Sequence, residues 1–315
     1  MRFSIASAAA LVTPLALAAA DALEYKSTPA GQVIKDGVKL RILPVGDSIT
    51  VGFASSDGNG YRLKLDENLS ALSVQLEATK TSPDNLAAND VVFAGTVTSG
   101  NLTDGYFAGW SGRTIQYIAD NVGPSLEQRP NVILLHAGTN DMNPNPDVSK
   151  EGNDPAGAAA RLGCLIDQMI TACPDATILV AQIVNTCDVN QRPATEEFQK
   201  LIPGVVEQRR NASHHVLAVD FAALGDGILR PDCIHPSDEG YRTMGDYWYD
   251  FIAQIPKDWI NQPVGNDPER PQGGAAANAD KTVSGSASAA TSLFKQKWLM
   301  PLIFQAMVTL MIMNN

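Results

Sequence analysis

The sequence predicts an α/β fold, a three-layer α/β/α sandwich built on a five-stranded parallel sheet. Five short runs rich in Val, Ile and Leu recur along the chain, and each has the length of a buried strand. Segments with the apolar spacing of helices lie between these runs. Because strands and helices alternate, the expected arrangement is a parallel sheet with helices on both faces.

The predicted strands are nearly continuous apolar runs, as expected where both faces of a sheet are covered. Their sequences are KLRILPV (39–45), DVVFAG (90–95), NVILLHAG (131–138), ATILVAQIV (176–184) and HVLAVD (215–220). Helices are predicted over residues 60–72, 112–122, 156–172, 194–211 and 237–255. Pro256 follows the last of these segments and ends it, because proline cannot continue a helix.

Residues 1–20 are predicted to be a secretory signal peptide and not part of this fold. They carry Arg2, then the apolar run ASAAALVTPLALAAA, and they end in small residues at Ala18 and Ala20 that fit a cleavage site. A membrane helix is the alternative interpretation, but the apolar run is short and is interrupted at Pro14. The pattern therefore favours secretion.

Residues 298–315 are predicted to be the apolar tail of a glycosylphosphatidylinositol (GPI) anchor signal, because small residues at 284–287 and a polar spacer precede them. A membrane-spanning tail anchor is the alternative, but no basic cluster follows the tail. Residues 261–297, rich in Pro, Gly, Ala and Ser, are predicted to be a disordered stalk. The expected domain is therefore residues 23–260, carried by a secreted protein that a lipid anchor holds at the cell surface or cell wall.

The charge of the chain limits its partners. It carries 23 Lys and Arg residues against 34 Asp and Glu residues, a formal net charge of −11. This charge disfavours nucleic acid or an anionic membrane surface as the main partner. Three N-x-S/T sequons, at Asn68, Asn101 and Asn211, fit a secreted eukaryotic glycoprotein, although such triplets also arise by chance.

The chain has four cysteines, which predict disulfides in an oxidising compartment. Cys164 and Cys173 lie on one predicted helix, so their Cα atoms would be about 13 Å apart, too far for a bridge. Cys173 precedes the fourth predicted strand and Cys187 follows it, which places them at opposite edges of the sheet. Cys187 and Cys233 both fall in loops at the carboxyl edge. We therefore predict a Cys187–Cys233 disulfide, with Cys164 and Cys173 buried or free.

Residues that directly follow the predicted strands are the first candidates for a site, because ligands of parallel sheets bind at the carboxyl ends of the strands. Ser48 stands there, behind Gly46 and Asp47 at the end of the first strand. A serine in this position alone is usually a turn residue or a helix cap. The G-x-S-x-G elbow of α/β-hydrolases is absent, so the case for Ser48 as a nucleophile depends on its partners.

Partners for Ser48 are found in the stretch RPDCIHPSDEGYR, where Asp232 and His235 are close enough to share one turn. A serine nucleophile needs an imidazole to take its proton and a carboxylate to orient that ring. The alternatives are a helix-capping Asp beside an exposed His, or a metal pair, but the remaining histidines make no ligand spacing with His235. Those histidines are assigned to the surface (His214 and His215) or to a buried, hydrogen-bonded position near the site (His136).

Donors for an oxyanion are found at further positions on the same edge. Asn140 follows the third strand in AGTNDM, and one well-placed amide donor stabilises a tetrahedral intermediate by about 3 kcal/mol. The segment GYFAGWSGRTIQYI follows the second strand and offers Gly109 and Gly112, where the backbone can approach a ligand closely. Taken alone, the first could be an ordinary turn residue and the second a plain loop.

Together these segments resemble the four sequence blocks of the SGNH/GDSL hydrolase superfamily, over about residues 40–255. GDS at 46–48, GTND at 138–141 and DCIH at 232–235 match the first, third and last blocks. SGRTIQYI resembles the second block in its SG-x-T-I-x-x-I form, common in carbohydrate esterase family three, which selects Gly112 over Gly109. The resemblance implies a flavodoxin-like sandwich and a serine esterase that needs neither a metal nor another cofactor, and it suggests a fungal source.

The resemblance also implies a role for each site residue. Ser48 attacks the ester carbonyl, His235 takes and later returns the proton, and Asp232 orients His235. The backbone amides of Ser48 and Gly112 and the side chain of Asn140 form the oxyanion hole. Asp47 and Trp110 are predicted to bind substrate.

Similarity to carbohydrate esterase family three implies an ester substrate on an acetylated polysaccharide, as in an acetylxylan esterase. Tyr106, Phe107 and Trp110, next to Gly112, either stack on sugar rings or belong to the core. Two other functions stay open, a lipase or lysophospholipase of the same superfamily and a non-catalytic cell-wall scaffold. The complete set of four site residues argues against the scaffold (Ser48, Asn140, Asp232 and His235).

Overall fold

The computed structural model describes residues 22–71 and 89–270. The predicted signal peptide (1–20), the anchor tail (298–315) and most of the predicted stalk lie outside the described residues.

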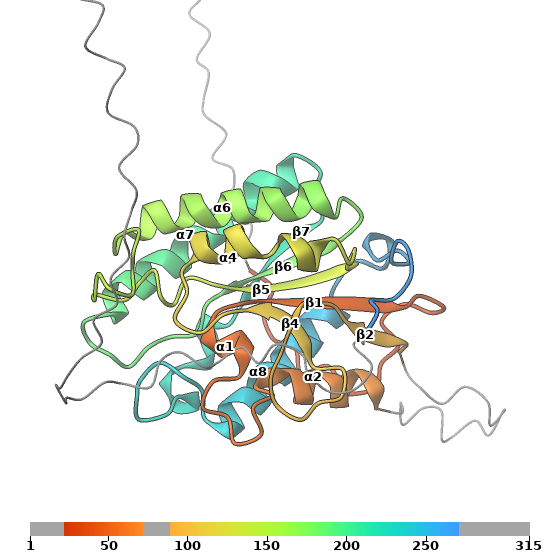
Figure 1. Ribbon diagram of the computed structural model, residues 1–315, viewed down its shortest axis with the longest axis horizontal. Coiled ribbons are helices and arrows are strands. Elements are labelled where there is room, and N and C mark those ends of the chain that lie inside the picture. Colours follow the sequence, from red (N-terminus) through yellow and green to blue (C-terminus); the bar gives the residue numbers. More distant parts are fainter. Residues whose placement is uncertain (1–21, 72–88, 271–315) are drawn as a thin grey trace, which may run out of the picture. The chain divides into compact units, whose positions relative to one another are not determined.

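The centre of the structure is a parallel sheet made from the five predicted strands (Figure 1). Within it the strands lie in the order β2-β1-β5-β6-β7, and each neighbouring pair is parallel. Their bounds are β1 Leu40–Gly46, β2 Val91–Phe93, β5 Val132–His136, β6 Thr177–Gln182 and β7 Val216–Asp220. The predicted α/β fold class is therefore confirmed.

Within residues 22–71 and 89–270 the sheet has seven strands, so the predicted number of five is too small. The missed strands are β3 (Val97–Thr98) and β4 (Tyr106–Gly109), which pair with each other in antiparallel orientation. The short strand β2 pairs only with the first half of β1, and β4 pairs in parallel with the last residues of β1. The sequence YFAG is short and ends in glycine, so it carries no strand pattern of its own.

Helices cover both faces of the sheet, as predicted (Figure 1). On one face lie α4 (Ile115–Asn121), α6 (Pro155–Ala172) and α7 (Arg192–Asn211), and on the other α2 (Tyr61–Ser70) and α8 (Asp238–Ala253). The short elements are α1 (Ser48–Val51), α5 (Gly123–Leu126) and the 3₁₀ turns η1 (Ala222–Leu224), η2 (Asp226–Ile228) and η3 (Lys257–Trp259).

An apolar core lies on each face of the sheet, between the strands and the helices, because side chains alternate along each strand. Leu43 and Val45 of β1 face the core under α4, α6 and α7, whereas Leu40 and Ile42 face the core under α2 and α8. All four side chains are completely buried. Packing on both faces thus fixes the orientation of β1. It also fixes the position of the residues that directly follow the strand, Asp47 and Ser48.

Residues 261–270, assigned to the stalk by sequence, contact the amino edge of the sheet. Arg41 is 1% exposed and donates hydrogen bonds to the carbonyls of Val264 (2.9 Å) and Gly265 (3.1 Å). The same guanidinium pairs with Asp267 at 3.1 Å. The described part of the chain therefore stays on the domain beyond the predicted boundary at residue 260.

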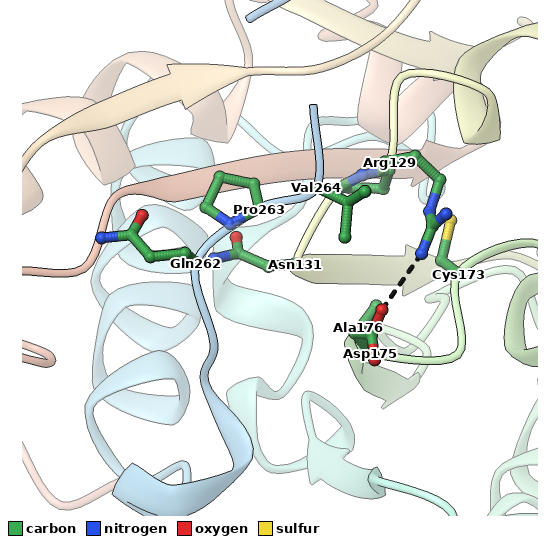
Figure 2. Close-up of a pocket in the computed structure, with 9 residues that line it drawn as sticks. Arg129, Asn131, Cys173, Asp175, Ala176, Gln262, Pro263 and Val264 are labelled. Atoms are coloured by element: carbon green, nitrogen blue, oxygen red, sulfur yellow. Dashed lines mark hydrogen bonds and ion pairs between the residues drawn. The ribbon is translucent and has the colours of Figure 1, made fainter. Parts of the chain in front are cut away.

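A small pocket lies beside this segment, at the amino ends of β5 and β6 (Figure 2). Arg129, which pairs with Asp175 at 3.1 Å, lines it together with Val264 and the buried free thiol of Cys173. Its volume of about 10 Å³ holds no more than a single water molecule. The pocket is at the edge of the sheet opposite to Ser48, so the candidate site does not include it.

Candidate active site

The turn between β1 and α1 places Ser48 at the carboxyl edge of the sheet. Gly46 ends β1, and a side chain there would clash with the carbonyl oxygen of His136 on β5. Asp47 then begins α1, because its side chain accepts a hydrogen bond from the backbone N–H of Ile49 at 3.0 Å. Ser48 is the first helical residue and is 6% exposed. The position of Ser48 is thus fixed by the strand that precedes it and by the capped helix that it begins.

Ser48, His235 and Asp232 form a continuous hydrogen-bonded chain. The Oγ atom of Ser48 lies 2.9 Å from Nε2 of His235, although the two residues are 187 positions apart in sequence. Nδ1 of His235 lies 3.0 Å from Oδ2 of Asp232. The structure therefore brings together the three residues that the sequence predicts as nucleophile, base and orienting carboxylate.

The environment of Asp232 favours its charged form. Burial raises the pKa of this carboxyl, but the backbone N–H groups of His235 (2.9 Å) and Ile234 (3.0 Å) and the imidazole of His235 outweigh it, so the pKa of Asp232 is lowered. An ionised Asp232 holds the imidazole proton on Nδ1. Nε2 then offers its lone pair to the hydroxyl of Ser48.

A disulfide and several backbone hydrogen bonds fix the turn that carries Asp232 and His235. The predicted Cys187–Cys233 bridge is present, with the two Cα atoms 4.6 Å apart. Cys233 itself adopts φ +64°. Its carbonyl accepts hydrogen bonds from the hydroxyl of Thr186 (2.7 Å) and the backbone N–H of Cys187 (3.2 Å). Of the other cysteines, Cys164 is free and exposed.

The predicted oxyanion donors lie on neighbouring segments at this edge. Strand β4 pairs with β1 so that Gly109 lies opposite Gly46, which brings the following residues beside the β1–α1 turn. Gly112 is exposed and adopts φ +72°, a conformation that other residues adopt only with strain. Asn140 donates one side-chain N–H to the carbonyl of Arg113 at 2.9 Å. Its second N–H remains for a ligand, because an amide nitrogen carries two.

Asp47 does not bind substrate, contrary to the sequence-based prediction. It is completely buried, and burial raises its pKa to about 7. Its side chain points inward to cap α1, so Asp47 supports the backbone at Ser48 and does not face the substrate.

A second buried carboxylate, Asp141, accepts a hydrogen bond from the N–H of Ile115 (2.9 Å) and pairs with Arg161 (2.9 Å). Burial raises the pKa of Asp141 as well.

The structure distinguishes among the three aromatic residues near Gly112. Phe107 is completely buried beneath the guanidinium of Arg62, 4.1 Å from its ring centre, and belongs to the core. Tyr106 is covered by Arg270, 3.7 Å from the ring centre. Trp110 is partly exposed and packs edge-on against another aromatic ring, at 5.9 Å. Trp110 also donates its backbone N–H to the carbonyl of Gly46 at 3.2 Å, which places it next to the β1–α1 turn, and it stays the candidate for contact with substrate.

The remaining histidines, His136, His214 and His215, are not part of the hydrogen-bonded chain of Ser48, His235 and Asp232. His136 is completely buried and its Nε2 accepts a hydrogen bond from the N–H of Val184 at 3.2 Å, as predicted. Burial lowers its pKa to about 4, so the ring is neutral near pH 7. His214 is exposed, whereas His215 stacks on Trp259 with ring centres 4.4 Å apart.

The three sequons differ in their exposure. Asn68 is 4% exposed, and its side-chain nitrogen, the atom that a glycan would modify, donates a hydrogen bond to Asp246 at 2.8 Å. The prediction of a glycan at Asn68 is therefore wrong for the folded chain. Asn101 and Asn211 are exposed and stay candidates.

Two residues of the site neighbourhood were missed by sequence reasoning. Arg62 is completely buried and donates hydrogen bonds to the carbonyls of Thr50 (3.3 Å) and Val51 (3.4 Å), at the carboxyl end of α1. Phe53 lies against the ring of His235, with ring centres 4.6 Å apart. Neither residue belongs to a motif, because each role depends on a contact between distant segments.

Two further findings concern residues 22–71 and 89–270. No group of three or more His, Cys, Asp or Glu side chains there is arranged to hold a metal ion. No helix in this part of the chain combines the length and apolar character needed to cross a membrane.

The profile of the GDSL-like lipase/acylhydrolase family matches residues 45–243, more than half of the chain. A family 3 carbohydrate esterase from Clostridium thermocellum has a similar structure, with a TM-score of 0.52 and 29% identity over 68% of this chain and 97% of that protein. A family 3 carbohydrate esterase from Talaromyces cellulolyticus also has a TM-score of 0.52, at 22% identity over 70% and 99% of the two chains.

Among curated proteins, a multidomain esterase from Ruminococcus flavefaciens is 28% identical over 232 residues, which cover 68% of this chain. A protein from Acetivibrio thermocellus, provisionally named endoglucanase X, is 28% identical over 148 residues, 46% of this chain. The chain spans only 28% and 60% of the lengths of these two relatives.

Proposed function

Because the chain belongs to the GDSL-like lipase/acylhydrolase family and is a carboxylic ester hydrolase, we propose that it removes O-acetyl groups from polysaccharides such as xylan. The observation that carries the proposed mechanism is the hydrogen-bonded chain from Ser48 through His235 to Asp232. Each atom in that chain has the partner that nucleophilic catalysis requires.

In the first half of the proposed reaction, Oγ of Ser48 attacks the carbonyl carbon of the ester while Nε2 of His235 takes the hydroxyl proton. The ionised Asp232 stabilises the imidazolium that forms. When the tetrahedral intermediate collapses, the bond to the sugar oxygen breaks and His235 gives its proton to that oxygen. The sugar leaves as an alcohol, and the acetyl group stays on Ser48.

In the second half, a water molecule attacks the acetyl carbonyl and His235 takes one proton from it. The bond between the acetyl carbon and Oγ then breaks, and the proton returns to Ser48. Acetic acid is released and the enzyme regains its starting state. In both halves the negative oxygen is held by the N–H groups of Ser48 and Gly112 and by the free N–H of Asn140, and one such donor is worth about 3 kcal/mol.

Support for a polysaccharide substrate comes from the comparisons and from one side chain. The similar protein from Clostridium thermocellum is a family 3 carbohydrate esterase, and its identity of 29% exceeds the 22% of the structure from Talaromyces cellulolyticus. Trp110 stands two residues before the candidate oxyanion donor Gly112 and is partly exposed. An exposed indole can pack against the apolar face of a sugar ring.

The experiment measures acetate released from acetylated xylan by the full-length protein, alongside simple esters with short and long acyl chains. Release of acetate from xylan, lost in Ser48→Ala and kept in Ser56→Ala, is the expected result; Ser56 is an exposed serine nearby. A preference for long acyl chains would instead identify a lipase or lysophospholipase. Absence of any hydrolysis would identify a scaffold protein.

We also propose that the protein is secreted and held at the cell surface by a GPI anchor. The composition of the two chain ends supports this, and so does the Cys187–Cys233 disulfide, since such bridges persist in oxidising compartments. In cells, deletion of residues 298–315 should release the protein into the medium. Surface retention of the deleted form would contradict the proposal.

A further inference from the structure

Phe53 is an exposed aromatic side chain that the proposed mechanism does not use. Its ring centre lies 4.6 Å from that of His235, and the two planes are tilted by 50°. The residue is 41% exposed. Isolated exposed apolar side chains are common on protein surfaces, so exposure by itself indicates nothing. This ring, however, lies next to the imidazole that transfers the proton in the proposed reaction.

Hydrogen bonds to both its N–H and its carbonyl group fix the backbone of Phe53 next to the site. Its N–H donates a hydrogen bond to the carbonyl of Ser48 at 2.9 Å. Its own carbonyl accepts a hydrogen bond from the hydroxyl of Tyr241 at 2.8 Å, and Tyr241 is 1% exposed. Gly52, which precedes it, adopts φ +84°. The backbone of Phe53 is therefore joined directly to that of the nucleophile, Ser48.

The loop of Phe53 is also tied to the turn that carries His235. Arg230 donates from its side chain to the carbonyl of Ala54 at 3.0 Å and from its backbone N–H to the carbonyl of His235 at 2.8 Å. These two hydrogen bonds connect the segment after α1 with the Asp-x-x-His turn. The backbone at Phe53 is thus tied to the turn that carries His235.

The chemistry of ester hydrolysis defines which part of the substrate lies there. His235 must give its proton to the departing oxygen, so that oxygen lies within hydrogen-bond distance of Nε2 in the transition state. The alcohol attached to that oxygen then extends over the surface next to the imidazole. The exposed ring of Phe53 is part of this surface.

We propose that Phe53 is the platform of the leaving-group subsite and packs against the apolar face of the sugar whose acetyl group is removed. This inference rests on the proposed function and adds the residue that selects the alcohol. A flat aromatic ring suits a sugar because it contacts the C–H groups of one face and leaves the hydroxyl groups in water. A small alcohol such as methanol is too short to make the contact.

The experiment compares two acetate esters on the full-length protein and its Phe53 variants. One substrate is a set of acetylated xylo-oligosaccharides, and the other is methyl acetate. The quantity measured is the ratio of kcat/KM for the sugar ester to kcat/KM for methyl acetate. Val33→Ala is the matched control, because Val33 is similarly exposed (45%) but lines a surface depression at the amino edge of the sheet, together with Arg41.

Phe53→Ala should lower this ratio by about tenfold, chiefly through a higher KM for the sugar ester. Phe53→Trp should restore the ratio, because it keeps a flat ring. Phe53→Leu should not restore it, although leucine still covers the imidazole with an apolar group. Val33→Ala should leave the ratio at the wild-type value.

Equal losses on both esters in Phe53→Ala would overturn the inference, because they would show that the ring only positions or shields His235. An unchanged ratio in Phe53→Ala would overturn it as well. If the wild-type protein hydrolyses methyl acetate but not the oligosaccharides, the proposed polysaccharide substrate is wrong and the inference fails with it. These results are distinguishable, since the last is obtained before any variant is made.

Discussion

Cys233, the residue directly after Asp232, is disulfide-bonded to Cys187. The bridge thus lies inside the Asp-x-x-His turn, and it connects that turn to the loop that follows β6 (Thr177–Gln182). A displacement of about 1 Å in a catalytic group can cost a hundredfold in rate. The disulfide therefore acts on the geometry of Asp232 and His235 in addition to its effect on the unfolded chain.

Replacing both cysteines of the bridge by serine should lower kcat at least tenfold with little change in KM, because the turn loses its tether. The free energy of unfolding should fall by about 2–4 kcal/mol. Ester hydrolysis and urea unfolding provide the two measurements, and Cys164→Ser, at an exposed free thiol, is the control. A double variant with wild-type kcat and reduced stability would show that the bridge serves the fold alone.

Asp232→Asn should keep the fold and lower kcat on the order of 10³-fold to 10⁴-fold. The amide fills the same space but cannot hold the proton of His235 on Nδ1. Steady-state kinetics on a simple acetate ester gives the number, with circular dichroism as the check on folding. A loss of less than tenfold would mean that the hydrogen bond between Asp232 and His235 is not needed for the reaction.

Asp47 should make the folded protein less stable as pH rises from about 4 to 7. The pKa of this carboxyl is near 3.9 when unfolded and is raised to about 7 when folded, so the folded state binds more protons in this interval. Its contribution is fully present below the unfolded pKa and is lost as pH rises through the folded pKa. Asp47→Asn, which can still cap α1, should remove this part of the pH dependence.

Urea unfolding at a series of pH values tests this prediction. The free energy of unfolding of the wild-type protein should decrease relative to that of Asp47→Asn as pH rises from about 4 to about 8, through the folded pKa, and the difference should be constant above about pH 8. Parallel curves for the two proteins across the whole interval would show that the carboxyl of Asp47 titrates normally in the folded state.

Arg62→Lys should lower the free energy of unfolding by about 2–4 kcal/mol. One ammonium group cannot replace a guanidinium that hydrogen-bonds the carbonyls of Thr50 and Val51 and lies over the ring of Phe107, 4.1 Å from its centre. A decrease in kcat should accompany the loss, because Arg62 supports the end of the helix that begins at Ser48. Urea unfolding and kinetics check both effects against Arg242→Lys at an exposed position, and identical behaviour of the two variants would contradict the assigned role.

The sequence predicted the parallel strands and the main helices because long apolar runs and helical periodicity are local signals. Strand β4 (Tyr106–Gly109) had no such signal, since it is formed by pairing with the free half of β1 (Leu40–Gly46). The predicted number of strands is therefore too low, although the five predicted strands are parallel neighbours in the sheet, as expected for an α/β fold. Residues 261–270 were likewise assigned to the stalk by composition, which does not show that Arg41 binds them.

The site residues were predicted where chemistry depends on short motifs. Ser48 and His235 stand in such motifs, and the sheet brings them together as expected. Asp47 was misassigned because a turn residue can point inward or outward, and only packing decides which. Phe53 and Arg62 were missed because their contacts join segments that are distant in sequence, and no local pattern marks them.

Covalent labelling shows whether Ser48 is the nucleophile. The full-length protein and Ser48→Ala are each treated with a fluorophosphonate, which reacts with activated serine hydroxyls, and the modified peptide is identified by mass spectrometry. We expect one adduct, on Ser48, together with loss of ester hydrolysis, and no adduct on the folded Ser48→Ala protein. Labelling of a different residue, or wild-type hydrolysis by Ser48→Ala, would contradict it.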